Sequence, residues 1–456
     1  MVEAIANSIE DKLIDGLSFK LSPGASYVQE RKSVTYHPQG SNIYTAIGGT
    51  KLIKMLITGD GWVDPSTFRI MFDLRNNESV DKELRPIGGP WSFFKRLRIL
   101  CAGAVVEDIT EYSRVHEMFS TLTAPDSRTN VDMEGFGRNI NIRDTDEAAL
   151  TALNLSGILP GQAQTVLFKP LSGLFNQNKF LPVRYAPITI ELELVNDAIE
   201  PILSKFGTGD PLDGPFTAAN TSLAWQIENV QAKLDLCTLD NGFENQYAEH
   251  LLEGKPLPIK YKTYVNQMQS LYGDGTNGQK DVRINVSRAL TRLKSVFVTF
   301  YLKSLDGSSK NLKEWNTFYS PMKAYATPGK LNQYNSNGEF EYQLQVGSKL
   351  FPEFPIRSHS EGYYQLRKCL GVQSSAVHNF DINSHEYRTS KFILGLDLER
   401  VLEAGFTGMN TRAGDLMSIL FKHSDATAAN YATSMHTVLH SDNILEIRDS
   451  GCQVFD

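Results

Sequence analysis

Residues 223–265, near the middle of the chain, read as a strand, a helix and a strand in immediate succession. Apolar and polar side chains alternate over residues 223–227, which is typical of a half-buried strand. The alternation slips by one position at residues 228–229 and then resumes from Val230 to Leu236. Because a single extra residue in a two-residue repeat is the mark of a β-bulge, we expect one long, bent strand.

A short helix follows this strand. Asn241 is expected to cap it, with Glu244 as the capping-box partner, and Gly254 and Pro256 are expected to end it. Its apolar stripe consists of Phe243, Tyr247 and Leu251. A new strand then starts at Pro258, with Ile259, Tyr261, Thr263 and Val265 on one face. This succession predicts a seam between two similar β domains.

The first half of the chain otherwise alternates strand patterns with loops. Strands are predicted at residues 52–57, 68–74, 96–101, 165–168 and 188–194. Asp108 is expected to cap a helix, with Glu111 as its capping-box partner and an inner face made of Ile109, Tyr112, Val115, Phe119 and Leu122. The long irregular stretch at residues 123–162 is interpreted as a surface loop.

The second half repeats this scheme. Strands are predicted at residues 282–286, 293–302, 342–346, 392–398, 416–421 and 438–447. Ser358 is expected to cap a helix, with Glu361 in the box position and Leu366 and Leu370 on the inner face. A strand, a glycine turn (Gly103 and Gly347) and a capped helix thus occur once in each half. This order predicts a duplicated domain in an all-β protein: two tandem antiparallel jelly-roll β-sandwiches, a double jelly roll, with a few short helices.

The expected organisation has four parts. Residues 1–17 form an N-terminal arm, residues 18–240 the first jelly roll, residues 241–256 a linker helix, and residues 257–456 the second jelly roll. Apolar residues recur every four positions in the arm (Ile5, Ile9 and Leu13). The arm is therefore either an amphipathic helix that docks on a neighbouring subunit or a frayed tail. No signal peptide is recognised there, and no apolar run approaches the roughly 20 residues needed to cross a bilayer.

Composition limits the function. The 456 residues, 41% of them hydrophobic, suffice for two large β domains. The net charge of −7 argues against a surface built mainly to bind nucleic acid. The four cysteines (Cys101, Cys237, Cys369 and Cys452) match no zinc or redox spacing, so we expect reduced thiols, with a disulfide as the less favoured alternative.

Motifs of catalysis and ligand binding are weak throughout. Residues 273–278 (GDGTNG) match the dinucleotide fingerprint, but a strand follows where a phosphate-binding helix is required. A hairpin tip without a ligand is therefore expected, rather than a nucleotide site or a calcium loop built on Asp274 and Asn277. His116 and Glu117 lack the second histidine of a zinc-protease helix, and a metal site at His359, His378 and His385 is disfavoured. The basic cluster of Lys95, Arg96 and Arg98 is interpreted as a salt-bridged strand face. We expect no catalytic residue, no cofactor-binding residue and no metal ligand.

Seven short segments, taken together, resemble one protein family. They are residues 63–68 (VDPSTF), 180–187 (FLPVRYAP), 288–297 (RALTRLKSVF), 346–358 (VGSKLFPEFPIRS), 398–400 (LER), 405–411 (GFTGMNT) and 443–451 (NILEIRDSG). This set is similar to the double jelly-roll major capsid proteins of double-stranded DNA viruses, those of polinton-like viruses above all. The resemblance extends from about residue 28 to the C-terminus.

The resemblance implies a structural protein rather than an enzyme. It implies that three chains form a pseudo-hexagonal capsomer, that capsomers tile an icosahedral shell in the virion after assembly in the host cell, and that penton and minor capsid proteins are partners. Direct nucleic-acid binding is not expected, and an internal membrane is left open. Surplus aromatic residues, such as those at residues 316–325, are expected at subunit contacts. The alternative is a carbohydrate-binding or carbohydrate-active β-sandwich, which needs exposed aromatic platforms, whereas Trp62 and Trp225 lie in or beside apolar strand patterns.

Overall fold

The structure is a computed structural model of the whole chain. It describes residues 28–79, 82–136, 157–202, 221–271, 281–302, 318, 320, 340–371, 380, 382–388, 391–401, 406–412, 416–423 and 432–456. The N-terminal arm, the fingerprint at residues 273–278, residues 316–317 and 321–325, and His378 lie outside these ranges.

The first half folds into two antiparallel sheets. One contains, in order, β1 (Val28–Tyr36), β9 (Trp225–Leu239), β4 (Trp62–Asn76) and β7 (Ala163–Phe168), with the short β2 (Ile43–Tyr44) also paired to β9. The other contains β3 (Leu52–Ile57), β8 (Ile188–Leu194), β5 (Phe94–Cys101) and β6 (Ala104–Thr110). In the central strands of these sheets alternate residues are buried in the core, as are Ile188, Ile190, Leu192 and Leu194 of β8.

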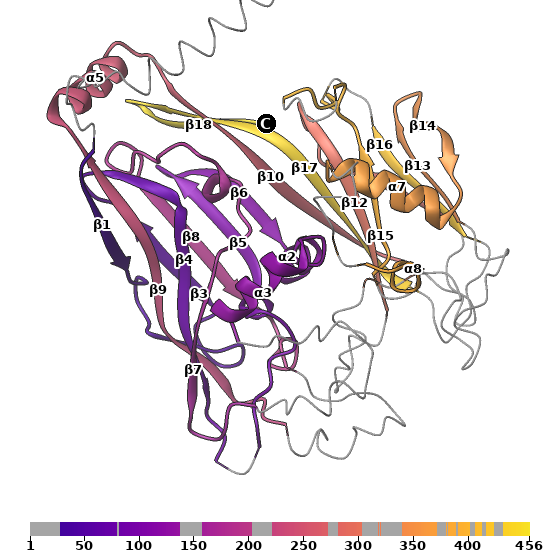
Figure 1. The fold of residues 1–456 in the computed structure, drawn as a ribbon, viewed down its shortest axis with the longest axis horizontal. Helices are drawn as coiled ribbons and strands as arrows, with labels where there is room; N and C mark the ends of the chain where they lie inside the picture. The colour runs from indigo at the N-terminus through magenta and orange to yellow at the C-terminus, as the bar shows by residue number, and fades with distance from the viewer. Residues whose placement is uncertain are drawn as a thin grey trace, which may run out of the picture.

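The second half builds the same pair of sheets. One contains β10 (Leu257–Ser270), β17 (Ala432–Arg448), β12 (Leu293–Leu302) and β15 (Ile393–Asp397), with β18 (Gly451–Phe455) also paired to β17. The other contains β11 (Asp281–Val286), β16 (Met417–His423), β13 (Phe340–Val346) and β14 (Lys349–Ile356). Figure 1 shows the two halves side by side.

The strand order is identical in the two halves. When the eight main strands of each half are numbered along the chain, one sheet has the order 1-8-3-6 and the other has the order 2-7-4-5. This is the order of a jelly roll, in which hairpin-connected strands alternate between two facing sheets. The chain is therefore a double jelly roll, as the sequence predicts, and β1 corresponds to β10 and β6 to β14.

The helices occupy corresponding places as well. The first half inserts α2 (Tyr112–Thr121) and α3 (Pro125–Glu134) between β6 and β7. The second half inserts α7 (His359–Cys369) and α8 (Ser384–Arg388) between the corresponding strands, β14 and β15. Two short 3-10 turns, η1 (Pro90–Phe93) and η2 (Leu174–Asn176), precede β5 and β8. None of the helices in the described part of the chain is long and apolar enough to span a membrane.

The predicted bulge in the central strand is confirmed. Asn229 has a positive φ of 51°, and the register between β9 and β4 shifts at the adjoining residues. The following helix, α5 (Asn241–Leu252), begins one position earlier than predicted. Asp240 is its N-cap, because the Asp240 side chain accepts a hydrogen bond from the Gly242 N–H at 3.1 Å. Glu244 does not close a capping box with Asn241; it accepts a hydrogen bond from Arg184 instead.

Two predictions for residues 108–136 are wrong. Asp108 caps no helix: it lies in β6, where it forms a bidentate ion pair with Arg96 of the neighbouring β5, at 2.7 and 2.6 Å. The helix starts only at Tyr112, after Glu111 has adopted a left-handed conformation at φ 49°. Residues 125–134, expected within a loop, form α3. By contrast, the Ser358 cap is confirmed, since its hydroxyl accepts a hydrogen bond from the Glu361 N–H at 3.2 Å.

Candidate functional site

A cluster of polar contacts lies between the two jelly rolls. Glu107 of β6 is buried there, and its carboxylate accepts hydrogen bonds from the Ser172 hydroxyl, from the Gly173 N–H at 2.8 Å and from the Leu174 N–H at 3.3 Å. Thr263 of β10 contributes a further hydrogen bond from the second jelly roll. Burial raises the pKa of Glu107, and these hydrogen bonds offset part of that rise.

Gly173 permits the close approach of the two domains at this point. A Cβ atom there would lie 1.3 Å from the Lys262 carbonyl oxygen of β10. Its φ of −71° is open to any residue, so glycine is required by contact and not by backbone conformation.

Hydrogen bonds join β6 directly to β10. The Tyr261 hydroxyl donates to the Val106 carbonyl at 2.9 Å, the Thr110 hydroxyl donates to the Asn266 carbonyl at 3.1 Å, and the Asn266 amide donates to the Thr110 carbonyl at 3.3 Å. β6 is the end strand of its sheet. An edge that would be open in a single jelly roll is therefore covered by the second one.

Aromatic contacts extend the interface along α2. The Phe119 ring lies 4.6 Å from the Tyr264 ring and 5.4 Å from the Phe297 ring, measured between centroids. The Arg114 guanidinium lies over the Tyr301 ring at 4.5 Å. Eight of the ten residues of α2 are buried, because its own sandwich covers one face and the second jelly roll covers the other.

On the corresponding surface of the second jelly roll, the described residues are buried to a much smaller extent. Only three of the eleven residues of α7 are buried (Gly362, Leu366 and Cys369), and these face its own sandwich. Tyr364 of α7 is 61% exposed, and Phe354 of the end strand β14 is 79% exposed. In the first jelly roll, β6 and α2 form the surface that packs on the second jelly roll, and we call it the β6–α2 surface. On the corresponding surface, formed by β14 and α7, aromatic side chains therefore lie in solvent. We call it the β14–α7 surface.

The residues of β1, the counterpart of β10, are exposed or only partly buried. Four residues of β10 are buried (Ile259, Tyr261, Thr263 and Asn266), three of them at the contact with the first jelly roll. None of the nine residues of β1 is buried. Arg31 of β1 pairs with Asp64 and Asp235, each at 2.8 Å, so this surface, which we call the β1 surface, is charged and polar.

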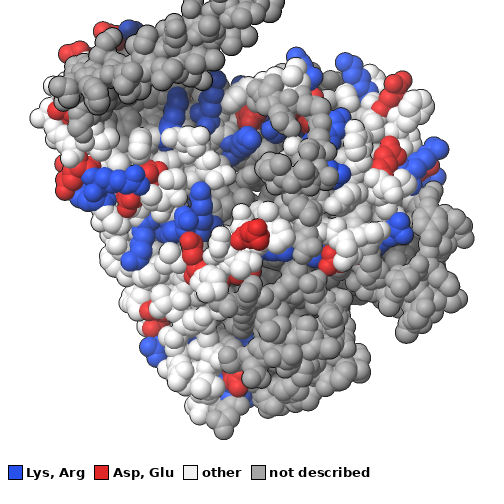
Figure 2. All heavy atoms as spheres, in the orientation of Figure 1, with Lys and Arg blue, Asp and Glu red and all other residues white. Residues whose placement is uncertain are grey.

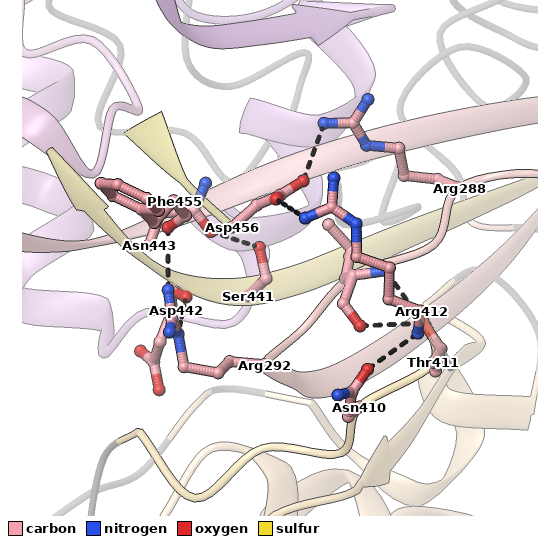
Figure 3. A network of polar contacts seen from close by, with 11 residues as sticks. Arg288, Arg292, Asn410, Thr411, Arg412, Ser441, Asp442, Asn443, Phe455 and Asp456 are labelled. Atoms are coloured by element: carbon pink, nitrogen blue, oxygen red, sulfur yellow. Dashed lines mark hydrogen bonds and ion pairs between the residues drawn. The ribbon is translucent and has the colours of Figure 1, made fainter. Parts of the chain in front are cut away.

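Arginines of one segment that carries the family resemblance, residues 288–297, contact the end of the C-terminal strand β18. Arg292 donates to the Asp442 carbonyl at 3.0 Å and to the Phe455 carbonyl at 2.8 Å, and Asp456 pairs with Arg288 and Arg412 at 3.4 and 3.1 Å (Figure 3). These contacts bind the end of β18 to the second jelly roll, while β18 also packs against β6 of the first.

The residues considered as chemical motifs have structural roles. His116 stacks on Trp91 at 4.0 Å, and Glu117 accepts a hydrogen bond from the Trp91 indole at 3.0 Å. Arg96 and Arg98 pair with Asp108 and Glu191 beside Lys95, which confirms the salt-bridged face. Among the described residues, no three His, Cys, Asp or Glu side chains gather into a possible metal site. His359 contacts the ring of Phe340, and the side chain of His385 lies outside the described part.

Tryptophan offers no carbohydrate platform in the described part of the chain. Trp62, Trp91 and Trp225 are all buried. An open apolar groove of about 500 Å³ lies beside α5, but Trp62 contributes only part of its wall. The other lining residues are Val28, Asn178, Lys179, Phe180, Pro182, Leu239, Phe243, Tyr247, Leu257, Pro258 and Ile259. Figure 2 shows basic and acidic side chains interspersed on the visible described surface, without a large basic area.

Sequence comparison identifies no relative: neither a family model nor a curated protein matches the chain. Solved structures do match along nearly its whole length. VP54 of PBCV-1, from a crystal structure fitted into a reconstruction of the virophage Sputnik, is 11% identical, with a TM-score of 0.60 over 96% of this chain and 99% of VP54. A cryo-EM structure of Sputnik gives 12% identity and a TM-score of 0.59 over 96% of this chain and 90% of that chain. The Faustovirus major capsid protein is 10% identical, with a TM-score of 0.53 over 94% of this chain and 92% of that chain. These likenesses show a shared double jelly-roll fold.

Proposed function

We propose that this chain is the major capsid protein of an icosahedral DNA virus, a structural protein without enzymatic activity, and that three copies form a pseudo-hexagonal capsomer. The observation that carries the proposal is the asymmetry of the contact between the jelly rolls. The β6–α2 surface of the first packs on the β10 side of the second, whereas the described residues of both equivalent surfaces, the β14–α7 surface and the β1 surface, are mostly exposed.

A ring follows when the same contact is repeated between chains. In a head-to-tail contact the two partner surfaces differ, and such a contact closes into a ring when its rotation divides a full turn. The β14–α7 surface of one chain would pack on the β1 surface of the next, as the β6–α2 surface packs on β10 within the chain. Three chains then supply six similar sandwiches around one axis, and such a tile packs hexagonally.

The comparisons support this assignment at the level of fold. The chain covers nearly all of the Faustovirus major capsid protein, and that protein covers nearly all of this chain. The seven segments described above support the finer assignment to the capsid proteins of polinton-like viruses. On this proposal the chain resides in the virion, is assembled inside the host cell, and contacts penton and minor capsid proteins. The division into an arm (1–17), two jelly rolls (18–240 and 257–456) and a linker helix (241–256) belongs to the proposal, with the arm on a neighbouring subunit.

Lysine substitutions on the β14–α7 surface test the contact between chains. Phe354→Lys and Tyr364→Lys each replace an exposed aromatic side chain that is expected to pack on the next chain, so both variants should shift the protein from trimer to smaller species in size-exclusion chromatography with light scattering. Met133→Lys is the matched control: Met133 is 64% exposed on α3, which packs beside β7 at the opposite end of the sheet from β1, and its trimer should persist. Unchanged trimers in both test variants, with wild-type circular dichroism, would refute the proposed contact.

A further inference from the structure

Two cysteines that are far apart in sequence lie in contact at the junction of the jelly rolls. Cys101 is the last residue of β5 in the first jelly roll, and Cys452 lies in β18, the C-terminal strand of the second. They are 351 positions apart, yet their Sγ atoms are 3.3 Å from each other. Both are free thiols in the structure.

The geometry is close to that of a disulfide. An S–S bond is about 2.05 Å long, so small side-chain rotations suffice to bring these sulfur atoms to bonding distance. The strands that carry them are held in place independently: β5 is paired on both sides, with β6 and β8, and β18 is paired with β17 and bound at its end by Arg292.

The two thiols differ in reactivity. Their mutual hydrogen bond and burial raise the pKa of Cys101, whereas the same hydrogen bond lowers the pKa of Cys452. Cys101 is buried and Cys452 is partly exposed. Cys452 is therefore the thiol that ionises first and that a dissolved oxidant can reach, and Cys101 is positioned to resolve the product.

We propose that Cys101 and Cys452 are a disulfide-forming site that ties the C-terminal strand of the second jelly roll to the first. The oxidant is a low-molecular-weight disulfide such as oxidised glutathione. The Cys452 thiolate attacks one of its sulfur atoms and releases one glutathione thiolate. Cys101 then gives up its proton and attacks Cys452 Sγ, which releases the second glutathione. Two protein thiols are oxidised, one glutathione disulfide is reduced, and the two thiol protons end on the two glutathione molecules.

The bond would close a loop that contains most of both jelly rolls. Cross-links across long loops remove much of the conformational freedom of the unfolded chain, so the folded protein gains stability. The two jelly rolls would also be unable to separate while β18 stays paired with β17. This inference concerns the contact within one chain and stands whether or not the chain assembles into capsomers.

Oxidation of the purified full-length protein tests the site. After incubation with oxidised glutathione, intact mass should fall by about 2 Da, non-reducing peptide mapping should link the Cys101 and Cys452 peptides, and the midpoint of thermal unfolding should rise by about 5 °C over the dithiothreitol-treated protein. Cys452→Ser and Cys101→Ser should each abolish the linked peptide and the rise in midpoint. Cys369→Ser should preserve both, since Cys369 is buried in α7 of the second jelly roll.

Two results would overturn the inference. One is stable addition of glutathione to Cys452 without the internal cross-link, which would mean that Cys101 cannot reach it. The other is the absence of any cross-link although iodoacetamide modifies Cys452 in the folded protein. Because the wild-type protein gives these readouts, misfolding of a serine variant does not decide the test.

Discussion

Replacing Gly173 with alanine should separate the two jelly rolls. The added Cβ would meet the Lys262 carbonyl oxygen at 1.3 Å, and real contacts of this kind do not fall below 3.0 Å, so the two backbones must move apart by about 1.7 Å. That movement also pulls Thr263 of the second jelly roll away from the Glu107 carboxylate of the first, which is buried. Overpacking costs about 1–3 kcal/mol, and a buried acceptor that loses one of its donors costs about 1–3 kcal/mol more. We expect a loss of about 2–6 kcal/mol in the contact between the domains.

Urea unfolding followed by circular dichroism, together with limited proteolysis, measures this loss. The wild-type jelly rolls should unfold together, whereas in Gly173→Ala the transition should split in two and cleavage within residues 241–256 should accelerate. Gly242→Ala is the control, because its Cβ would meet only the flexible Asp240 side chain, at 3.2 Å, inside α5. A single Gly173→Ala transition within about 1 kcal/mol of wild type would refute the view that this close approach holds the domains together.

Three further predictions follow from the structure. Burial lowers the pKa of His436 and His440 from 6.5 to about 3, so the unfolded chain binds protons that the folded chain excludes and stability should fall as pH drops from about 6.5 towards 3. Each imidazole should lower the free energy of unfolding by about 2 kcal/mol at pH 5. The raised pKa of Glu107 acts in the opposite direction and offsets part of this loss. In urea unfolding at several pH values, the free energy of unfolding of His440→Gln should depend less steeply on pH than that of the wild type, and an unchanged dependence would be inconsistent with a neutral buried imidazole. Arg292→Ala removes the donors to Asp442 and Phe455, so it should lower the free energy of unfolding by about 1–3 kcal/mol and speed amide exchange in β18. Arg448→Ala, at an exposed pair with Glu446, should lower it by less than about 1 kcal/mol. Equal losses in the two variants would argue against the view that Arg292 holds β18 in place. Finally, filter binding should detect no duplex DNA affinity below micromolar at physiological salt, and tight binding with a steep salt dependence would contradict the acidic, mixed-sign surface.

Local patterns predicted the elements whose structure depends on near neighbours. The single slip in alternation near Asn229 sufficed to locate the bulge, because side chains on a strand alternate with a period of two residues. Ser358 and Glu361 correctly marked a helix start, since a cap and its partner lie within one turn. The duplicated order of strands and helices was visible for the same reason.

Elements governed by distant partners were missed or misassigned. Asp108 and Glu111 have the spacing of a capping box, but the Asp108 carboxylate pairs with Arg96 on the neighbouring strand instead. The strand β1 has no buried residue and hence no alternating pattern. β14 contains Pro352 and Pro355, and prolines in a sequence indicate a loop more often than a strand. They are tolerated in β14 because it is an end strand. α3 buries only Arg128 and therefore has no apolar stripe.

The candidate site shows the same limit more strongly. Nothing in the spacing of Glu107, Gly173 and Thr263 indicates that they meet, and the contact between Cys101 and Cys452 spans 351 positions. Their proximity depends on how the two jelly rolls dock, and no local periodicity encodes that docking. The expectation of no catalytic or ligand-binding residues remains a prediction.

The mass of the native protein tests the central claim most directly. Size-exclusion chromatography with multi-angle light scattering, run at several loading concentrations, should give three times 50.9 kDa or a larger multiple of that trimer, and the value should persist on dilution, because interfaces of thousands of Å² are usually permanent. Electron microscopy of the same fraction should show pseudo-hexagonal particles. A well-folded monomer of 50.9 kDa at every concentration would contradict the assignment as a capsid protein.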